Sequence, residues 1–257
     1  MEDFRLPEGM VGLPTKIDIR TIEKAKAATV QIGIPGEVPN FSGVIVRDRY
    51  VVTCAHHNRL PGEILEITLE DGRLSKAVVR GTNRLTDTCV LEIVDRGAWP
   101  SVKLGFSNVL PPGYSVLVVG YPVSNEGTQL VLRTSSVTEK PEGGLPRRDS
   151  FSRTLFLECN DENIVTNLRG ASGGGIFDSA GNLVGVLSST NAAWTNPERI
   201  FHGEIWNTRV ELIHKNWEDL VNGTEVTTVA QDLLNDLQPK LADLQSKIQA
   251  LTAKPDK

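Results

Sequence analysis

The chain has 257 residues, of which 39% are hydrophobic and 23% are charged, and it carries a formal net charge of −5 at pH 7. This balance is typical of a globular protein, and the acidic excess argues against nucleic acid as the main partner. No apolar run is long enough to span a membrane. We therefore expect neither a nucleic acid nor a membrane as partner.

The three cysteines, Cys54, Cys89 and Cys159, stand at no metal-ligand spacing and form no Cys-x-x-Cys pair. We expect free thiols, a reducing compartment, and neither a metal site nor a cofactor. The N-terminus is acidic and lacks the basic start and apolar core of a signal peptide. These features predict a cytoplasmic protein. A periplasmic or secreted location stays open if the sequence is that of a mature form.

The first part of the chain predicts an extended arm followed by a short helix. Residues 1–20 hold few periodic apolar positions, and a helix is expected over residues 22–28, where Thr21 is suited to cap it. Residues 1–28 are therefore expected to precede the main domain.

A series of short strands follows. Stretches rich in β-branched residues and bounded by Gly or Pro predict strands. They cover residues 29–34, 41–46, 50–53, 64–69, 77–80, 90–93, 114–120, 129–133, 154–158, 175–177 and 183–188. About a dozen strands with almost no helix among them predict an all-β barrel or sandwich. A turn at residues 111–113 allows two similar halves.

The C-terminal part changes character. Residues 211–220 predict a helix, and residues 223–257 predict an amphipathic helical segment with a heptad pattern, which Pro239 kinks or restarts. Its apolar positions alternate at steps of three and four: Leu234, Leu237, Leu241, Leu244, Ile248 and Leu251. Two interpretations remain open. The segment docks on its own domain, or it associates with a second copy or another partner.

A glycine-rich stretch at residues 168–177 contains one serine, Ser172, between Gly170 and a run of three glycines. Glycine at this density indicates positive φ or close contact with a ligand. A nucleophilic serine needs an unobstructed hydroxyl and backbone N–H groups directed at the oxyanion, and Gly170 and Ser172 are placed to supply that pair. A plain glycine turn between strands is the alternative.

A serine hydroxyl becomes a good nucleophile when a base removes its proton, and the base is usually a histidine held by a carboxylate. Of the four histidines, His56 and His57 directly follow the apolar strand expected at residues 50–53, and Asp87 precedes the strand expected at residues 90–93. In isolation each has an ordinary explanation, as a surface imidazole or as a carboxylate that caps a turn.

Taken together, these residues resemble trypsin-like serine proteases of the chymotrypsin fold (clan PA), and within them the HtrA/Deg type. The resemblance covers residues 30–206, in the family's order His, Asp, Ser. It rests on Val52-Thr-Cys-Ala-His56, Thr86-Asp-Thr-Cys-Val, Gly170-Ala-Ser-Gly-Gly-Gly and Gly181-Asn-Leu-Val-Gly-Val. It implies a protease domain over residues 29–222, built of two six-stranded antiparallel β-barrels that meet near residues 110–111. A C-terminal helical extension follows, without a PDZ domain.

The resemblance also implies roles for individual residues. His56 would be the general base and acid, Asp87 the residue that orients it, and Ser172 the nucleophile. Gly170 and Ser172 would form the oxyanion hole, and Ser188 would lie near the buried aspartate. The implied activity is that of a serine endopeptidase, which cleaves protein or peptide substrates through an acyl-enzyme intermediate and needs no cofactor.

The loop between Cys159 and Gly170 is longer than in the HtrA type, which leaves the substrate pocket less well defined. Its walls are expected among Thr166, Ser188, Ser189, Thr190 and His202. None of them offers the acidic floor that selects Arg or Lys, so a small or medium apolar side chain is the expected match, and His202 leaves an acidic side chain open as the alternative. The alternative function is a catalytically silent or partner-activated binding module that retains the protease fold.

Overall fold

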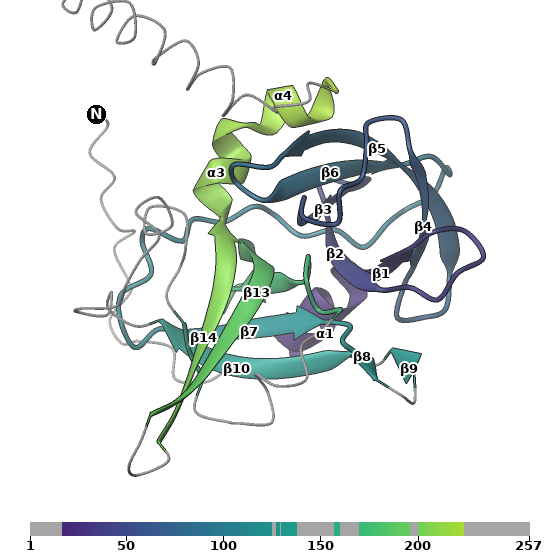
Figure 1. Cartoon of the computed structure of the whole chain (residues 1–257). Coiled ribbons are helices and arrows are strands. Elements are labelled where there is room, and N and C mark those ends of the chain that lie inside the picture. The colour runs from purple at the N-terminus through teal and green to yellow at the C-terminus, as the bar shows by residue number, and fades with distance from the viewer. Residues whose placement is uncertain are drawn as a thin grey trace, which may run out of the picture.

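The computed structural model describes residues 17–124, 127–128, 130–137, 157–159, 170–195 and 200–223. Several expectations from the sequence fall outside these ranges. They are the arm up to residue 16, the first part of the strand expected at residues 154–158, the loop between Cys159 and Gly170 with Thr166, and the heptad segment after Gly223. Within the described ranges, no helix has the length and apolar character needed to cross a membrane. Among the described residues, strands are the main type of regular secondary structure (Figure 1).

The first six strands close into an antiparallel barrel in the order β1-β2-β3-β6-β5-β4. They are β1 (Thr29–Gly33), β2 (Phe41–Val46), β3 (Tyr50–Thr53), β4 (Ile64–Thr68), β5 (Leu74–Asn83) and β6 (Thr88–Ile93). Buried side chains such as Ile45, Leu65 and Leu91 fill its interior. All six strands were predicted, but β5 is longer than expected because it continues through a bulge between Val79 and Gly81.

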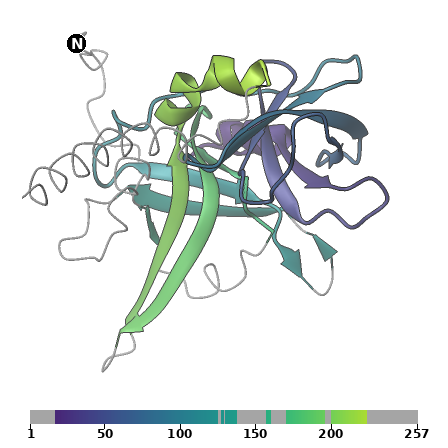
Figure 2. The same ribbon diagram turned by 45° about the horizontal axis from the view of Figure 1, so that its top comes forward.

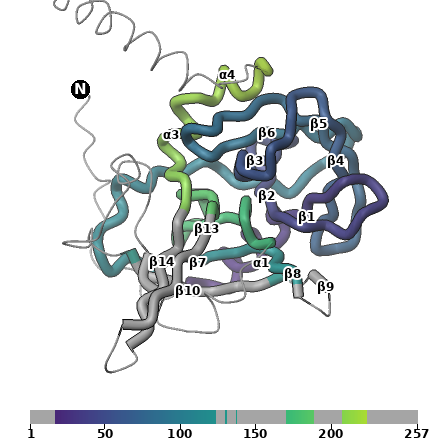
Figure 3. The backbone as a smooth tube through the Cα atoms, viewed as in Figure 1, coloured from purple at the N-terminus to yellow at the C-terminus, as the bar shows by residue number. Residues whose placement is uncertain are grey.

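The second barrel is also antiparallel and has the strand order β10-β11-β14-β13-β12-β7. Its strands are β7 (Ser115–Gly120), β10 (Val131–Val137), β11 (Leu157–Cys159), β12 (Gly175–Phe177), β13 (Leu183–Thr195) and β14 (Ile200–Arg209), and a separate pair is formed by β8 (Val123–Ser124) and β9 (Gly127–Thr128). The all-β fold of two six-stranded barrels is thereby confirmed. Residues 94–114 connect the barrels (Figure 3).

Strand β14 was not predicted from the sequence. Its residues mix polar and apolar side chains without a clear alternation. Its extended conformation is fixed by pairing with β13 along most of its length and with β11 at Gly203 and Glu204. Tertiary pairing, rather than local preference, decides its conformation.

Three helices of the described part of the chain accompany the barrels. Helix α1 (Ile19–Ala28) begins earlier than predicted, and its N-cap is Asp18, whose Oδ1 accepts a hydrogen bond from the backbone N–H of Thr21 at 2.7 Å. The prediction of Thr21 as cap was therefore wrong. The predicted helix at residues 211–220 consists of α3 (Val210–Lys215) and α4 (Trp217–Val221), which are separated at Asn216. Both lie along the top of the barrels (Figure 2).

A buried apolar cluster joins the two barrels. It combines residues from the facing sides of the barrels and from the helices: Ala25, Val44, Val52, Val119, Phe177, Val210, Trp217 and Leu220 are among its members. Full burial of a side chain of this size contributes about 1.5–3 kcal/mol. The cluster therefore fixes the position of each barrel relative to the other, and the candidate site is formed where they meet.

Candidate active site

Ser172 lies in a tight turn that leads into β12, and hydrogen bonds attach this turn to the first barrel. The backbone N–H of Ser42 on β2 donates to the carbonyl of Ser172 at 2.8 Å. The Ser42 hydroxyl donates to the carbonyl of Gly170 at 3.0 Å and accepts the backbone N–H of Tyr121 at 2.9 Å. Residues 170–175, which we call the serine loop, are thus held by one buried serine of the opposite barrel.

The glycines of the serine loop are explained by its close approach to β2 and β3. Gly173 has φ +87°, and a Cβ there would lie 2.0 Å from the carbonyl oxygen of Ser42 and 2.1 Å from Thr53 Oγ1. The Thr53 hydroxyl donates to that same carbonyl at 2.6 Å. Only glycine fits this position, because both the backbone conformation and the space exclude a side chain.

His56 and Asp87 are joined at the rim of the first barrel. The Nδ1 atom of His56 lies 2.9 Å from Oδ2 of Asp87. The other carboxylate oxygen, Oδ1, accepts the backbone N–H groups of Ala55 at 2.9 Å and of His56 at 2.8 Å. The hydroxyl of Ser188 also donates to Oδ2. The structure therefore brings together the predicted pair and the predicted neighbouring serine.

The electrostatics of Asp87 keep it ionised. Burial by itself would raise its pKa, but the hydrogen bonds from His56 and Ser188 outweigh burial and hold the pKa of Asp87 below its usual range. An ionised carboxylate at Nδ1 favours the imidazole tautomer with its proton on Nδ1, which leaves a lone pair on Nε2. His56 is consequently arranged to take up a proton at Nε2, with Asp87 stabilising the imidazolium.

Ser188 links Ser172 to the pair formed by His56 and Asp87. Its hydroxyl donates to the carbonyl oxygen of Ser188 at 3.1 Å. Strand pairing shifts register between Leu187 and Ser189, and such a bulge redirects a side chain. Ser188 thereby directs its hydroxyl at Asp87 and its carbonyl at Ser172. Within the described residues, Ser172 makes no hydrogen bond to His56, whose Nε2 faces the thiol sulfur of Cys54 at 3.7 Å.

The backbone N–H groups of the serine loop differ in their partners. Gly173 donates to the carbonyl of Leu187 at 2.7 Å, and Gly174 donates to the carbonyl of Ala171 at 2.9 Å. The N–H groups of Gly170 and Ser172 have no acceptor among the described residues. These are the two donors that were predicted for an oxyanion hole.

His57 has a different environment from its neighbour. Its ring stacks on Phe41 with a centroid separation of 4.2 Å. Burial, followed by electrostatic interaction with His56 and Arg59, lowers its pKa to about 4. Its Nε2 atom is buried and has no hydrogen-bond partner among the described residues. His57 is therefore neutral at physiological pH and does not contact Asp87 by a hydrogen bond.

The thiols of Cys54 and Cys89 are buried and free, as predicted for these two cysteines. Burial raises the pKa of Cys54 well above its usual value and that of Cys89 to about 12. Both thiols are thus protonated at neutral pH. Cys54 has an immediate polar neighbour in the site, since its sulfur approaches His56.

The remaining predicted pocket residues lie on two neighbouring strands. Ser189 and Thr190 follow Ser188 on β13, and His202 on β14 pairs with Ala193. Thr166 lies outside the described residues. The substrate-binding roles of this group stay predictions.

Two contributors, Ser42 and Thr53, were missed in the sequence. Ser42 is a fully buried hydroxyl residue inside the otherwise apolar strand β2. A polar residue in such a strand needs hydrogen-bond partners, and that was the available signal. The partners of its hydroxyl could not be identified, because Tyr121 and Gly170 are 79 and 128 positions away in the sequence.

Comparison with known proteins shows which family the chain resembles. Residues 41–186, more than half of the chain, match the trypsin-like peptidase domain family. The chain is 31% identical over 149 residues to the serine endoprotease DegS of Escherichia coli, a match that covers 56% of this chain and 38% of DegS. It is 30% identical over 154 residues to putative protease Do-like 14 of Arabidopsis thaliana, which covers 56% of this chain and 34% of that protein. The chain therefore matches little more than a third of the length of these relatives.

A solved structure, that of the HtrA-type protease AlgW with a tripeptide, shares the fold. The two align with a TM-score of 0.58 at 21% sequence identity, and the alignment covers 80% of this chain and 64% of the other.

Proposed function

Because the chain belongs to the trypsin-like peptidase family, we propose that it is a serine endopeptidase with His56, Asp87 and Ser172 as its catalytic triad. The observation that carries the proposal is the 2.9 Å hydrogen bond between His56 Nδ1 and Asp87 Oδ2. It occurs beside a serine loop in which glycine is sterically required. The similarity to DegS and AlgW favours the HtrA type.

The proposed reaction begins when the Ser172 hydroxyl turns from the Ser188 carbonyl to His56 Nε2. His56 takes the proton while Oγ attacks the carbonyl carbon of the peptide bond. The N–H groups of Gly170 and Ser172 stabilise the oxyanion. His56 then protonates the leaving amine, and water attacks the resulting ester with His56 again as base.

Asp87 acts throughout as a fixed negative charge. Its Oδ1 is held by the N–H groups of Ala55 and His56, and its Oδ2 by Ser188 and the imidazole. A carboxylate with these donors is already oriented when the imidazolium forms, so little reorganisation is needed. Ser188 is therefore a positioning residue for Asp87.

The turn of Ser172 is energetically small. A neutral hydrogen bond of this kind contributes about 0.5–1.5 kcal/mol net, so a bound substrate or partner is able to change it. The hydrogen bond from the Ser172 hydroxyl to the Ser188 carbonyl also favours the second candidate function, a binding module or a protease that a partner activates. In that case the bond to Ser188 is the resting state that the partner releases.

The substrates that fit this proposal are proteins or peptides, and the chemistry requires no cofactor. The segment after Gly223 supplies a proposed surface for self-association or for docking of a partner. The substrate class follows from the protease fold, and the association surface follows from the heptad pattern.

Labelling with a fluorophosphonate probe tests the proposal, because the probe phosphonylates a serine only when its base and oxyanion donors function. Wild type is compared with Ser172→Ala and with denatured wild type, and mass spectrometry places the adduct. Labelling at Ser172 of the folded wild type alone supports the triad. Labelling that appears only after cell extract is added supports partner activation. Absence of labelling under both conditions contradicts catalysis and leaves the binding module.

A further inference from the structure

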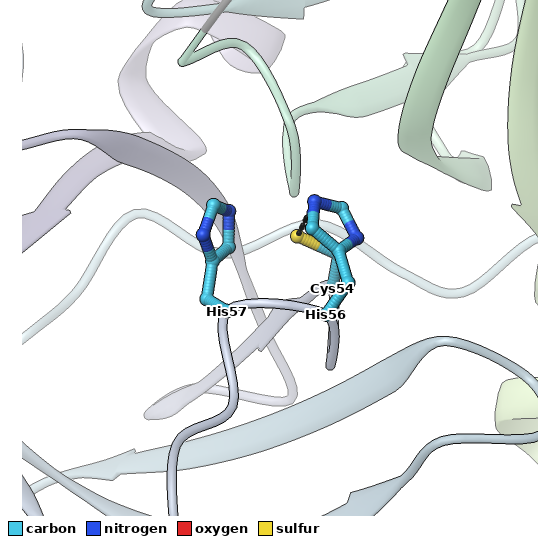
Figure 4. A group of neighbouring side chains, drawn as sticks. All are labelled: Cys54, His56 and His57. Atoms are coloured by element: carbon cyan, nitrogen blue, oxygen red, sulfur yellow. Dashed lines mark hydrogen bonds between the residues drawn. The ribbon is translucent and has the colours of Figure 1, made fainter.

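Three side chains at the site carry atoms that bind transition metals. The sulfur of Cys54, a ring nitrogen of His56 and a ring nitrogen of His57 all lie within 4.8 Å of one another. Figure 4 shows the two imidazole rings on the same side of the chain, with the Cys54 sulfur between them. We propose that Cys54, His56 and His57 form a zinc site that blocks the catalytic histidine reversibly.

The spacing of two of these ligands already suits a tetrahedral ion. A tetrahedral zinc ion with Zn–S near 2.3 Å and Zn–N near 2.0 Å places the two ligand atoms about 3.5 Å apart. The sulfur of Cys54 and Nε2 of His56 are 3.7 Å apart. Both atoms can therefore bind one ion without a change of the backbone.

The orientation of His56 is also that of a metal ligand. Metal-binding histidines usually donate their other N–H group to a carboxylate, which fixes the tautomer and makes the ligand nitrogen more basic. His56 bonds Asp87 through Nδ1 at 2.9 Å. The same tautomer thus suits both a general base and a ligand, and an ion on Nε2 occupies the lone pair that has to accept the proton of Ser172.

His57 supplies an independent observation. Its buried Nε2 has no hydrogen-bond partner among the described residues, and a buried polar atom without a partner costs about 1–3 kcal/mol. The ring stays within reach of its neighbour, since the centroids of His56 and His57 are 4.6 Å apart. One ring nitrogen of His57 lies within 4.8 Å of both other ligand atoms, so a rotation of its side chain would bring the ring to the ion. Binding through the unpaired nitrogen would remove the cost of leaving it without a partner.

The ligand set favours a transition metal over Mg²⁺ or Ca²⁺. One sulfur and two imidazole nitrogens suit Zn²⁺, whereas Mg²⁺ and Ca²⁺ require oxygen ligands. On binding, the Cys54 thiol releases its proton to solvent and the thiolate joins the ion, while both imidazoles bind through lone pairs. The fourth position stays open to water. Loss of the ion to a chelator returns the proton and frees Nε2.

The binding test uses the full chain with Ser172→Ala and without a histidine tag, so that its result does not depend on catalysis. Co²⁺ serves as a spectroscopic probe and Zn²⁺ is titrated against a competing chelator. We expect one ion per chain and a thiolate-to-cobalt charge-transfer band. Adding Cys54→Ala should remove the band and weaken zinc binding by at least about tenfold, and His57→Phe should weaken it similarly.

Cys89→Ala is the matched control, because it removes another buried free thiol of the same barrel and should leave the band and the affinity unchanged. Circular dichroism verifies the fold of each variant, and His57→Phe decides the result if Cys54→Ala unfolds. A protein without the charge-transfer band overturns the proposal. Equal zinc affinity in the Cys54→Ala and Cys89→Ala variants does so as well.

The inhibitory part rests on the proposed function and has its own test. Fluorophosphonate labelling of Ser172 is measured with zinc and with chelator, and each variant is compared with its own rate in chelator. Zinc should slow labelling of a chain with an intact cluster and should have at least tenfold less effect on Cys54→Ala. Zinc binding without slower labelling contradicts inhibition by zinc. If Ser172 is not labelled under any condition, the proposed protease function fails, and the zinc site is judged by the binding test alone.

Discussion

The backbone N–H of Ser42 donates a hydrogen bond to the carbonyl oxygen of Ser172 at 2.8 Å. This bond joins β2 of the first barrel to the serine loop of the second, and the Ser42 hydroxyl adds a second bond to Gly170. The position of the proposed nucleophile is therefore set by a residue of the barrel that carries the proposed base.

Replacement of Ser42 by alanine removes the hydroxyl that bridges Gly170 and Tyr121. We expect a loss of about 1–3 kcal/mol in the free energy of unfolding, because a buried carbonyl and a buried N–H lose their partner. The rate of fluorophosphonate labelling should fall by up to about 100-fold, since the serine loop shifts. Ser75→Ala, which removes a hydroxyl bonded to Asp95 away from the site, should leave labelling unchanged. Equal effects of both variants on labelling would contradict a positioning role.

The two adjacent histidines should respond differently to mutation. His56→Ala removes the proposed base and should lower peptide hydrolysis by several orders of magnitude, about as much as loss of Ser172, because triad members act as a unit. His57→Ala leaves the bond between His56 and Asp87 intact and should be much milder. Hydrolysis rates of both purified variants, measured with chelator present, check this ranking. The reverse order would assign the base to His57.

Gly173→Ala tests the steric argument for the serine loop. The new Cβ would lie 2.0 Å from the carbonyl oxygen of Ser42 and 2.1 Å from Thr53 Oγ1, far inside van der Waals contact, so we expect a large loss of stability and of labelling. Gly72→Ala is the control, since Gly72 has a similar φ of +81° with nothing within 4 Å of its Cβ position. That variant should lose only the backbone cost of about 1–2 kcal/mol. Thermal unfolding of both variants measures these losses of stability. Similar losses would show that the clash with Ser42 and Thr53 is not what destabilises Gly173→Ala.

The stability of the protein should depend on pH through His57. Its pKa is about 4 in the folded chain against a usual 6.5, so between these values the unfolded chain binds a proton that the folded chain does not. The contribution of His57 to stability is complete above pH 6.5 and is lost as the pH falls toward 4. His57→Phe keeps a ring on Phe41 and should show a flatter profile of unfolding free energy over this range. Identical profiles would mean that His57 titrates normally.

Removal of the chain after Gly223 tests the heptad segment. If the segment associates with a second copy, light scattering should show a smaller oligomeric mass for the truncated protein than for the full chain. The truncated protein should unfold at nearly the same temperature in that case. An unchanged mass together with a lower unfolding temperature would show instead that the segment docks on its own domain.

The sequence predicted the first barrel and most of the second, because short β-branched stretches between turns have few other folds available to them. It placed His56, Asp87 and Ser188 correctly relative to one another only through a family resemblance, since the contact between Asp87 and Ser188 spans 101 positions. It missed β14, whose conformation depends on strand pairing. It also missed the N-cap of α1, because Asp18 and Thr21 are both suitable cap residues and Thr21 instead donates to the carbonyl of Ser179.

The cluster of Cys54 with the two histidines was not recognised as a candidate metal site from the sequence. Metal sites are usually recognised in sequences by separated pairs of ligands, and these three ligands lie within four consecutive residues. The three side chains come together just after β3, where the chain leaves the barrel. Asp87 fixes His56 there by hydrogen bonds to its backbone N–H and to its ring.

The helices at the two ends of the described chain each contact the barrel that is farther away in the sequence. Helix α1, which precedes the first barrel, hydrogen-bonds through Thr21 and Lys24 to residues Ser179 and Ala180 of the second. Helix α4, which follows the second barrel, packs on β5 and β6 of the first, where Arg80 donates to the carbonyl of Val221 at 3.2 Å. During synthesis on the ribosome, the first barrel therefore emerges with its α4-binding side uncovered. His56 and Asp87 leave the ribosome before Ser172, so the three residues of the proposed triad come together only after the second barrel has been synthesised.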